Sequence, residues 1–173
     1  GLRPQSLVMV GSGERIATVE RLVELRATDP GANVLVEFLD DAVEAHRAIL
    51  RRALSFPGTI VASDAMPLVA PAAVDGDAQL DWPIPPGWTT HPRTAGTFTR
   101  SLRLLVDEVG ESWSDALARC SLLPARTLER AVPAMADKGR LRPGADADIV
   151  VFDPASLRDR ASYLDGTRPS EAN

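Results

Sequence analysis

Short apolar runs alternate with helical segments in the first third of this chain. Residues 6–10 (SLVMV) and 59–64 (TIVASD) have the length and composition of buried strands. Between them, residues 15–27 and 32–54 have helical periodicity, and the second segment is interrupted near Asp40. The order strand, helices, strand is typical of α/β folds with parallel strands. We therefore expect an α/β fold whose ligands bind at the carboxyl ends of its strands.

Both expected strands end in polar residues. Asp64 closes the second strand, where a carboxylate can cap the following turn or can hold a metal-bound water and accept its proton. The spacing of residues around Asp64 leaves both explanations open. Its position at the end of a strand favours the role in metal binding and proton transfer. Ser12 follows the first strand and is a weaker candidate for substrate contact.

A long segment without periodicity, residues 65–96, connects the second strand to the next helix. Its proline content, together with Trp82 and Trp88, favours an ordered lid over a flexible tether. Near its end lie His91 and Arg93. They form either a proline-rigidified turn or an anion site, in which the guanidinium grips a carboxylate and His91 acts as a ligand or polariser.

Three amphipathic helices are expected next, at residues 96–110, 112–120 and 124–129. Thr97 is the expected N-cap of the first and Gly110 its stop, and Ser112 opens a capping box. A turn at Pro143 then precedes an apolar strand, residues 148–153 (DIVVFD). We place a domain boundary near residue 135, which gives a first domain of residues 1–135 and a partial small β domain of residues 136–173.

Composition excludes several classes of partner. The net charge is −5 and the isoelectric point about 5.0, which argues against nucleic acid or an anionic membrane as the main partner. No apolar run is long enough to cross a bilayer, and residues 6–10 are too short for a signal peptide. A single cysteine, Cys120, makes a reducing compartment the default, so we expect a cytoplasmic location.

Four other reactive side chains are expected to be structural. His46 lies on an apolar helix face, and Cys120 lies on the face of its helix that points to the core. Asp146 and Asp148 lie just before and at the start of an expected strand. In that position, a role in the preceding turn explains the two carboxylates better than metal binding does.

Four motifs follow one another along the chain: Ser63-Asp64 after a strand, HPRTAGTF (91–98), SLLPARTLE (121–129) and KGRLRPGADADIVVFDP (138–154). Together they resemble the carboxyl-terminal part of an amidohydrolase of the N-acyl-D-amino-acid deacylase (D-aminoacylase) group. The form SDAMP, the lid rich in Trp and Pro, and VPAMADKGRL (132–141) resemble its N-acyl-D-glutamate deacylase branch. The resemblance covers about residues 1–165.

The resemblance implies the last part of a (β/α)₈ TIM-type barrel of the metal-dependent hydrolase type, followed by the start of a small β-sandwich. It implies zinc-dependent hydrolysis of the amide bond of N-acyl-D-amino acids, with one or two zinc ions. Asp64 would be a metal ligand and the proton shuttle, and Arg93 would hold the substrate carboxylate. Ser12 and His91 would lie near that carboxylate.

The chain also departs from this pattern, because the His-x-His metal ligands of such enzymes are missing. We therefore expect a fragment that is inactive in isolation and whose partner is the missing N-terminal part. One alternative is a cyclic-amide hydrolase related to dihydroorotase or hydantoinase, which would share Asp64 and the PGADADIVVFD element but not HPRTAGTF. The other is a truncated module without catalytic activity.

Overall fold

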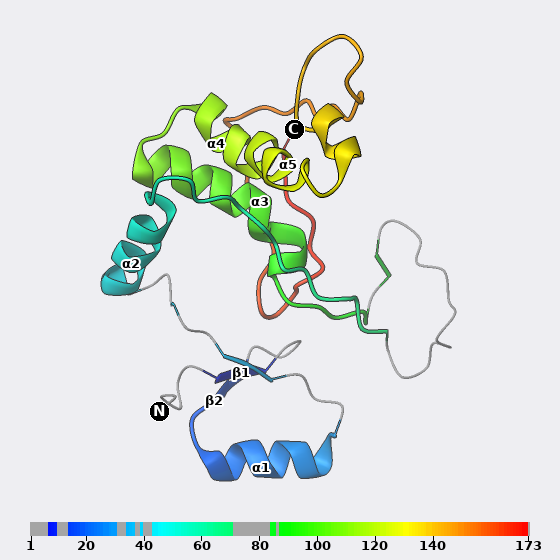
Figure 1. Cartoon of the computed structure of the whole chain (residues 1–173). Coiled ribbons are helices and arrows are strands. Elements are labelled where there is room, and N and C mark those ends of the chain that lie inside the picture. The colour runs from blue at the N-terminus through cyan, green and yellow to red at the C-terminus, as the bar shows by residue number, and fades with distance from the viewer. Residues whose placement is uncertain are drawn as a thin grey trace.

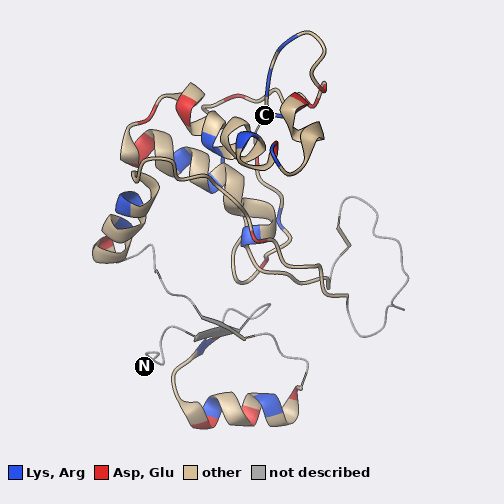
Figure 2. Cartoon of the chain, viewed as in Figure 1, with Lys and Arg blue, Asp and Glu red and all other residues tan. Residues whose placement is uncertain are grey.

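The computed structural model describes residues 7–9, 14–30, 34–36, 39, 43–70, 84–85 and 87–172. A small sheet with one helix lies at one end of the molecule, and a layer of helices lies at the other (Figure 1). Acidic and basic residues alternate along helices in both parts (Figure 2). No helix in the described ranges has the length and apolar character needed to cross a membrane.

The sheet is antiparallel, so the expectation of parallel pairing is wrong for the strands described. Its order is β2-β1-β3, formed by β1 (Leu7–Met9), β2 (Arg15–Ile16) and β3 (Val34–Val36). Leu7 pairs with Ile16 on one side and with Val36 on the other. The expected strand at residues 6–10 is confirmed, whereas residues 34–36, expected to be helical, form a strand because β1 offers them a free edge.

Helix α1 (Val19–Thr28) covers this sheet. It begins later than expected because the Thr18 side chain accepts a hydrogen bond from the amide of Arg21 and caps the helix. It ends at Asp29, as the Asp-Pro-Gly sequence predicts. Ile16 and Leu25 are buried together and form the core of this part.

The helical layer is built around one long helical run. Helix α3 (Arg93–Arg103) continues into a π-helical segment, η2 (Leu104–Val109), and Gly110 ends the run with a left-handed φ of 84°. Thr97 is not the N-cap, because the helix begins four residues earlier and the Thr97 hydroxyl donates to the Arg93 carbonyl. Helices α2 (Glu44–Leu54), α4 (Trp113–Cys120), α5 (Leu122–Leu128) and η3 (Pro133–Asp137) complete the layer.

The core of the layer joins segments that are distant in the sequence. Five buried residues form it: Val61, Leu102, Leu105, Ala116 and Leu157. Both α4 and α5 form where the sequence predicts them, and Ser112 caps α4 through the amide of Asp115 at 3.1 Å.

Residues 59–64 are extended but do not form the expected strand. No other strand flanks them in the described part of the chain, so their backbone groups pair with helices instead. The amide of Val61 donates to the carbonyl of Arg119 at 3.0 Å. The Arg119 guanidinium donates in turn to the carbonyls of Leu54 and Thr59, both at 3.1 Å. The segment is therefore fixed to the end of α4.

Residues 148–153 do not form the expected strand either. Val150 and Val151 are 83% and 92% exposed. In the described part of the C-terminal region, one isolated bridge joins Arg158 to Glu171, and no β-sandwich strands are present. The proposed boundary near residue 135 falls inside η3 and stays a prediction.

Candidate active site at the start of α3

Two threonines attach the chain after residue 64 to the start of α3. The Thr94 hydroxyl donates to the Met66 carbonyl at 3.2 Å and accepts from the Met66 amide at 3.3 Å. The buried Thr90 hydroxyl lies 2.9 Å from that of Thr94 and reaches the same carbonyl at 3.3 Å. A hydroxyl can donate and accept at once, so this pair satisfies both backbone groups of Met66.

Backbone pairing continues this attachment along the segment. Val69 and Thr89 form an antiparallel bridge with hydrogen bonds of 2.8 and 3.0 Å. Residues 64–69 and 89–94 therefore run side by side although much of the expected lid separates them in the sequence. Residues 71–83 and 86 of that lid lie outside the described residues.

Asp64 lies at the point where the extended segment turns toward α3. Its φ is +46°, the left-handed region that aspartate tolerates better than most residues. Its side chain is 87% exposed, and Oδ2 lies 3.2 Å from Nη2 of Arg93. The turn thus presents the carboxylate to solvent and to a cation at once.

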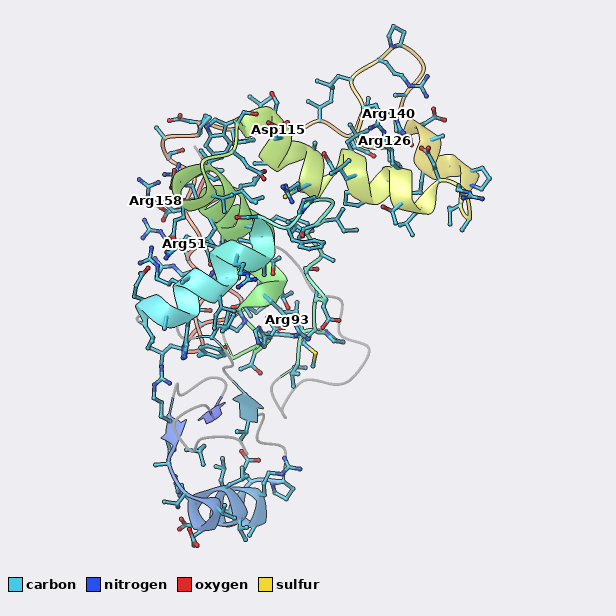
Figure 3. All side chains as sticks on the ribbon, turned by 60° about the vertical axis from the view of Figure 1, so that its left-hand side comes forward. Arg51, Arg93, Asp115, Arg126, Arg140 and Arg158 are labelled. Atoms are coloured by element: carbon cyan, nitrogen blue, oxygen red, sulfur yellow. The ribbon has the colours of Figure 1, made fainter. Side chains whose placement is uncertain are left out.

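Arg93 is the first residue of α3 and lies at the lower end of the helical layer (Figure 3). One of its Nη atoms pairs with Asp64, while the buried Nε finds no acceptor within the described residues. Buried donors nearly always have a partner, so this unpaired one sets Arg93 apart from the other described side chains. A carboxylate is the acceptor that suits a guanidinium best.

His91 is held beside this pair. Its Nδ1 accepts a hydrogen bond from the Arg93 amide at 3.0 Å, so the neutral ring carries its proton on Nε2. Burial lowers the pKa of His91 below the usual 6.5, and the Arg93 charge lowers it further, while Asp64 opposes both. The imidazole is therefore neutral at pH 7 and cannot serve as a second cation.

A cavity of about 380 Å³ opens beside these residues. His91, Arg93, Arg100, Asp159 and Tyr163 line its polar part, and leucines of α2 and η2 line another side. Asp159 and Tyr163 come from the expected small β domain and are not among the residues predicted from the sequence. Only the fold places these two residues against α3, and no local sequence pattern predicts that they line the cavity.

Three of the four candidate residues, Asp64, Arg93 and His91, thus come together, and Ser12 lies outside the described residues. Three of the four residues expected to be structural have contacts that can be described, and the role of His46 stays a prediction. Cys120 packs against the core of the layer, and burial raises its thiol pKa to about 11. Asp146 and Asp148 both pair with Lys138.

The described residues do not by themselves fit a zinc site. Among them, no three His, Cys, Asp or Glu side chains lie close enough together to hold a metal ion. Catalytic zinc usually takes three protein ligands, whereas Asp64 here faces a cation. Zinc binding thus stays a prediction that depends on ligands beyond these residues.

Three curated proteins of Alcaligenes xylosoxydans xylosoxydans are similar to this chain. An N-acyl-D-glutamate deacylase is 43% identical over 74 residues, which are 42% of this chain and 14% of that protein. An N-acyl-D-aspartate deacylase is 34% identical over 118 residues, 68% of this chain and 19% of the relative. A D-aminoacylase is 31% identical over 114 residues, 66% of this chain and 19% of the relative.

These alignments show that the chain spans less than a fifth of the length of the curated relatives it matches. No family model matches the chain, and no solved structure matches it significantly. Two of these relatives are named as deacylases and the third as an aminoacylase, and none of the three is named as a cyclic-amide hydrolase. Over part of its length, the chain is therefore similar to enzymes that remove acyl groups from D-amino acids.

Proposed function

We propose that this chain is part of an N-acyl-D-amino-acid deacylase and carries the groups that bind the substrate carboxylate and move the proton. The observation that carries the proposal is the cavity-lining Arg93, whose buried Nε has no acceptor among the described residues and whose Nη2 lies 3.2 Å from Asp64. The names of the similar proteins support the reaction class.

Arg93 would bind the carboxylate of the amino-acid part of the substrate. Its guanidinium can make two parallel hydrogen bonds to a carboxylate, which fixes both position and orientation. The present pair with Asp64 does not prevent this, because Asp64 is largely exposed and exposed ion pairs contribute about 1 kcal/mol or less. An arriving carboxylate can therefore displace Asp64 at little cost.

Asp64 would carry the proton. Hydrolysis joins a water oxygen to the acyl carbon, breaks the C–N bond and requires a proton on the leaving nitrogen. The Asp64 carboxylate would take the proton from the water and return it to that nitrogen. Zinc would activate the water in such an enzyme, and we propose that ligands outside the described residues hold it together with Asp64.

His91 would keep Arg93 in place. It accepts the hydrogen bond of the Arg93 amide, and its lowered pKa keeps it neutral near the Arg93 charge. We assign it this positioning role and no proton transfer. Ser12 and the preference for N-acyl-D-glutamate stay predictions of the resemblance.

The natural polypeptide that carries this sequence is the protein with which to test the proposal. With zinc present, it should release free D-amino acid from N-acetyl-D-glutamate, N-acetyl-D-aspartate or N-acetyl-D-leucine, and much less from the L enantiomers. Asp64→Asn should lower kcat by about 10²-fold or more. The control Asp148→Asn changes an exposed carboxylate that pairs with Lys138 and should leave kcat unchanged.

Two results would contradict the proposal. One is hydrolysis that survives Asp64→Asn at the normal rate. The other is a zinc-loaded natural polypeptide that releases no amino acid from any of the three D substrates.

A further inference from the structure

One arginine of α4, Arg119, joins three parts of the chain. Its Nη1 donates to the carbonyls of Leu54, Phe56 and Thr59 at 3.1, 3.4 and 3.1 Å. Its backbone carbonyl accepts from the Val61 amide at 3.0 Å. The end of α2 and the extended segment after it are therefore both bonded to this one residue of α4.

Glu111 holds the Arg119 guanidinium in the orientation that these bonds need. Nε donates to Oε2 of Glu111 at 3.0 Å, and Nη2 donates to Oε1, so the pair is bidentate and both planar groups are fixed. Each of the two side chains is 15% exposed, and an ion pair so well covered is weakly screened by salt. Nη1 is thereby left to the backbone carbonyls.

Asp64 lies between two attachments of the extended segment. Upstream, Arg119 fixes Val61. Downstream, the Thr94 hydroxyl bonds both backbone groups of Met66. Asp64 itself has a φ of +46°, and no other residue of the described chain except glycine has a positive φ. A strained backbone of this kind persists where the surroundings hold it, and the two attachments provide that restraint.

We infer that Arg119 is a positioning residue for the reaction. Through its bonds to the chain before Asp64, it holds that carboxylate where it can take the proton from the water and return it to the leaving nitrogen. Arg119 is not among the residues that line the cavity beside Arg93, so it acts through the backbone and not on the substrate. This inference rests on the proposed function and adds a residue to it.

The test removes the arginine without leaving a buried charge. In the double variant Glu111→Gln/Arg119→Met, no carboxylate remains without its cation, a loss that would by itself destabilise the fold. The matched control is Glu129→Gln/Arg140→Met. Arg140 also pairs with a carboxylate, that of Glu129, and donates to two backbone carbonyls. These bonds hold the chain around η3 and not the segment that leads to Asp64.

Kinetics of the natural polypeptide separate positioning from folding. With the N-acetyl-D-amino acid that it hydrolyses fastest, Glu111→Gln/Arg119→Met should lower kcat about tenfold or more, because a small displacement of a catalytic group is costly. KM should change less than about twofold, since Arg93 belongs to α3. In an Asp64→Asn background, the same double variant should lower kcat less than about twofold, because the carboxylate that Arg119 positions is then absent. The control should leave kcat and KM unchanged.

A second readout requires neither turnover nor metal. In NMR of the zinc-free natural polypeptide, labelled over the residues of this chain, the ¹³C shifts of Asp64 depend on its backbone angles. They should move in Glu111→Gln/Arg119→Met and stay in place in the control. If the double variant does not fold, Arg119→Lys replaces it in both measurements. Lysine keeps the charge opposite Glu111 but lacks the planar fork of donors, so kcat should fall about threefold.

Four results would overturn the inference: a normal kcat in the folded Arg119 variant, an equal loss in the control, an undiminished loss in the Asp64→Asn background, or unchanged Asp64 shifts. Each can occur while Asp64→Asn still lowers kcat in the natural polypeptide. The proposed function would then stand, and only the role of Arg119 would fall. Hydrolysis that survives Asp64→Asn at the normal rate would instead remove the proposed function.

Discussion

Two segments with the same strand-like pattern have opposite surroundings in this molecule. Residues 59–64 are fixed by the end of α4, and Val61 is 7% exposed. Residues 148–153 expose Val150 at 83%, and within the described chain the backbone groups of residues 147–152 have no hydrogen-bond partner. The difference shows that an apolar pattern predicts an extended backbone, while pairing and burial depend on the neighbours that the fold supplies.

This difference also separates the two segments in function. The fixed segment leads into Asp64 and brings it to Arg93, so its position determines the geometry of the candidate site. The exposed segment leads into residues 157–172, which reach the cavity through contacts of their own with α3. Perturbations of the first segment should therefore be costly, and matched perturbations of the second should be mild.

The largest effect is expected from a charge placed in the fixed segment. Val61→Asp should lower the free energy of unfolding by about 3 kcal/mol or more, because it buries a carboxylate without a partner. Val150→Asp should change it by less than about 0.5 kcal/mol, since the side chain is exposed. Urea denaturation followed by circular dichroism measures both, and similar losses would show that the comparison is wrong.

The next effect concerns the close approach of the C-terminal segment to α3. Gly166→Ala should destabilise the chain by about 2–3 kcal/mol, because the new methyl group would meet the Thr90 backbone. Gly144→Ala introduces no clash, and its left-handed φ of 84° should cost about 1 kcal/mol. Equal losses in thermal unfolding would indicate that residues 157–172 do not pack as described.

The sequence predicted the parts of the structure that local chemistry determines. The Ser112 cap, the Gly110 stop and the helix around Pro124 all formed where expected, because each depends on groups within one or two turns. The expected strand pairing failed, because a strand needs a neighbour that local pattern cannot supply. The barrel implied by the resemblance is not seen in the described residues, whose regular secondary structure is mostly helical.

The candidate site divides in the same way. Asp64, His91 and Arg93 could be named because a strand-end carboxylate and a histidine–arginine pair before a helix are local patterns. Asp159 and Tyr163 could not, since only the packing around Gly96 and Gly166 brings them to the cavity.

A smaller effect should follow from loosening the attachment of the fixed segment. Thr94→Val keeps the shape of the side chain but removes its hydrogen bonds to both backbone groups of Met66, which should cost about 1–2 kcal/mol. The control Thr127→Val removes one exposed bond to the carbonyl of Leu123 and should cost less than about 0.5 kcal/mol. Chemical denaturation measures the free energy of unfolding of both variants. If Thr94→Val leaves that free energy unchanged, Thr94 does not attach the fixed segment to α3.

The smallest effect is a dependence of stability on pH. The pKa of His91 is lowered on folding, so the unfolded chain takes up a proton first as the pH falls below about 6.5. The contribution of His91 to stability therefore decreases from that pH down to its folded pKa. In NMR titrations the His91 ring should titrate below pH 6.5, and Arg93→Met should raise its midpoint. A midpoint at or above 6.5 would contradict this assignment.

The central claim is that the fixed segment and α3 together form a carboxylate-binding site at Arg93. Its most direct test compares the binding of N-acetyl-D-leucine with that of N-acetyl-D-leucinamide, which lacks the carboxylate. The chain should prefer the acid by about tenfold or more, Arg93→Met should abolish this preference, and the control Arg126→Met, on the surface of α5, should retain it. An unchanged preference in Arg93→Met would show that the carboxylate binds elsewhere or not at all.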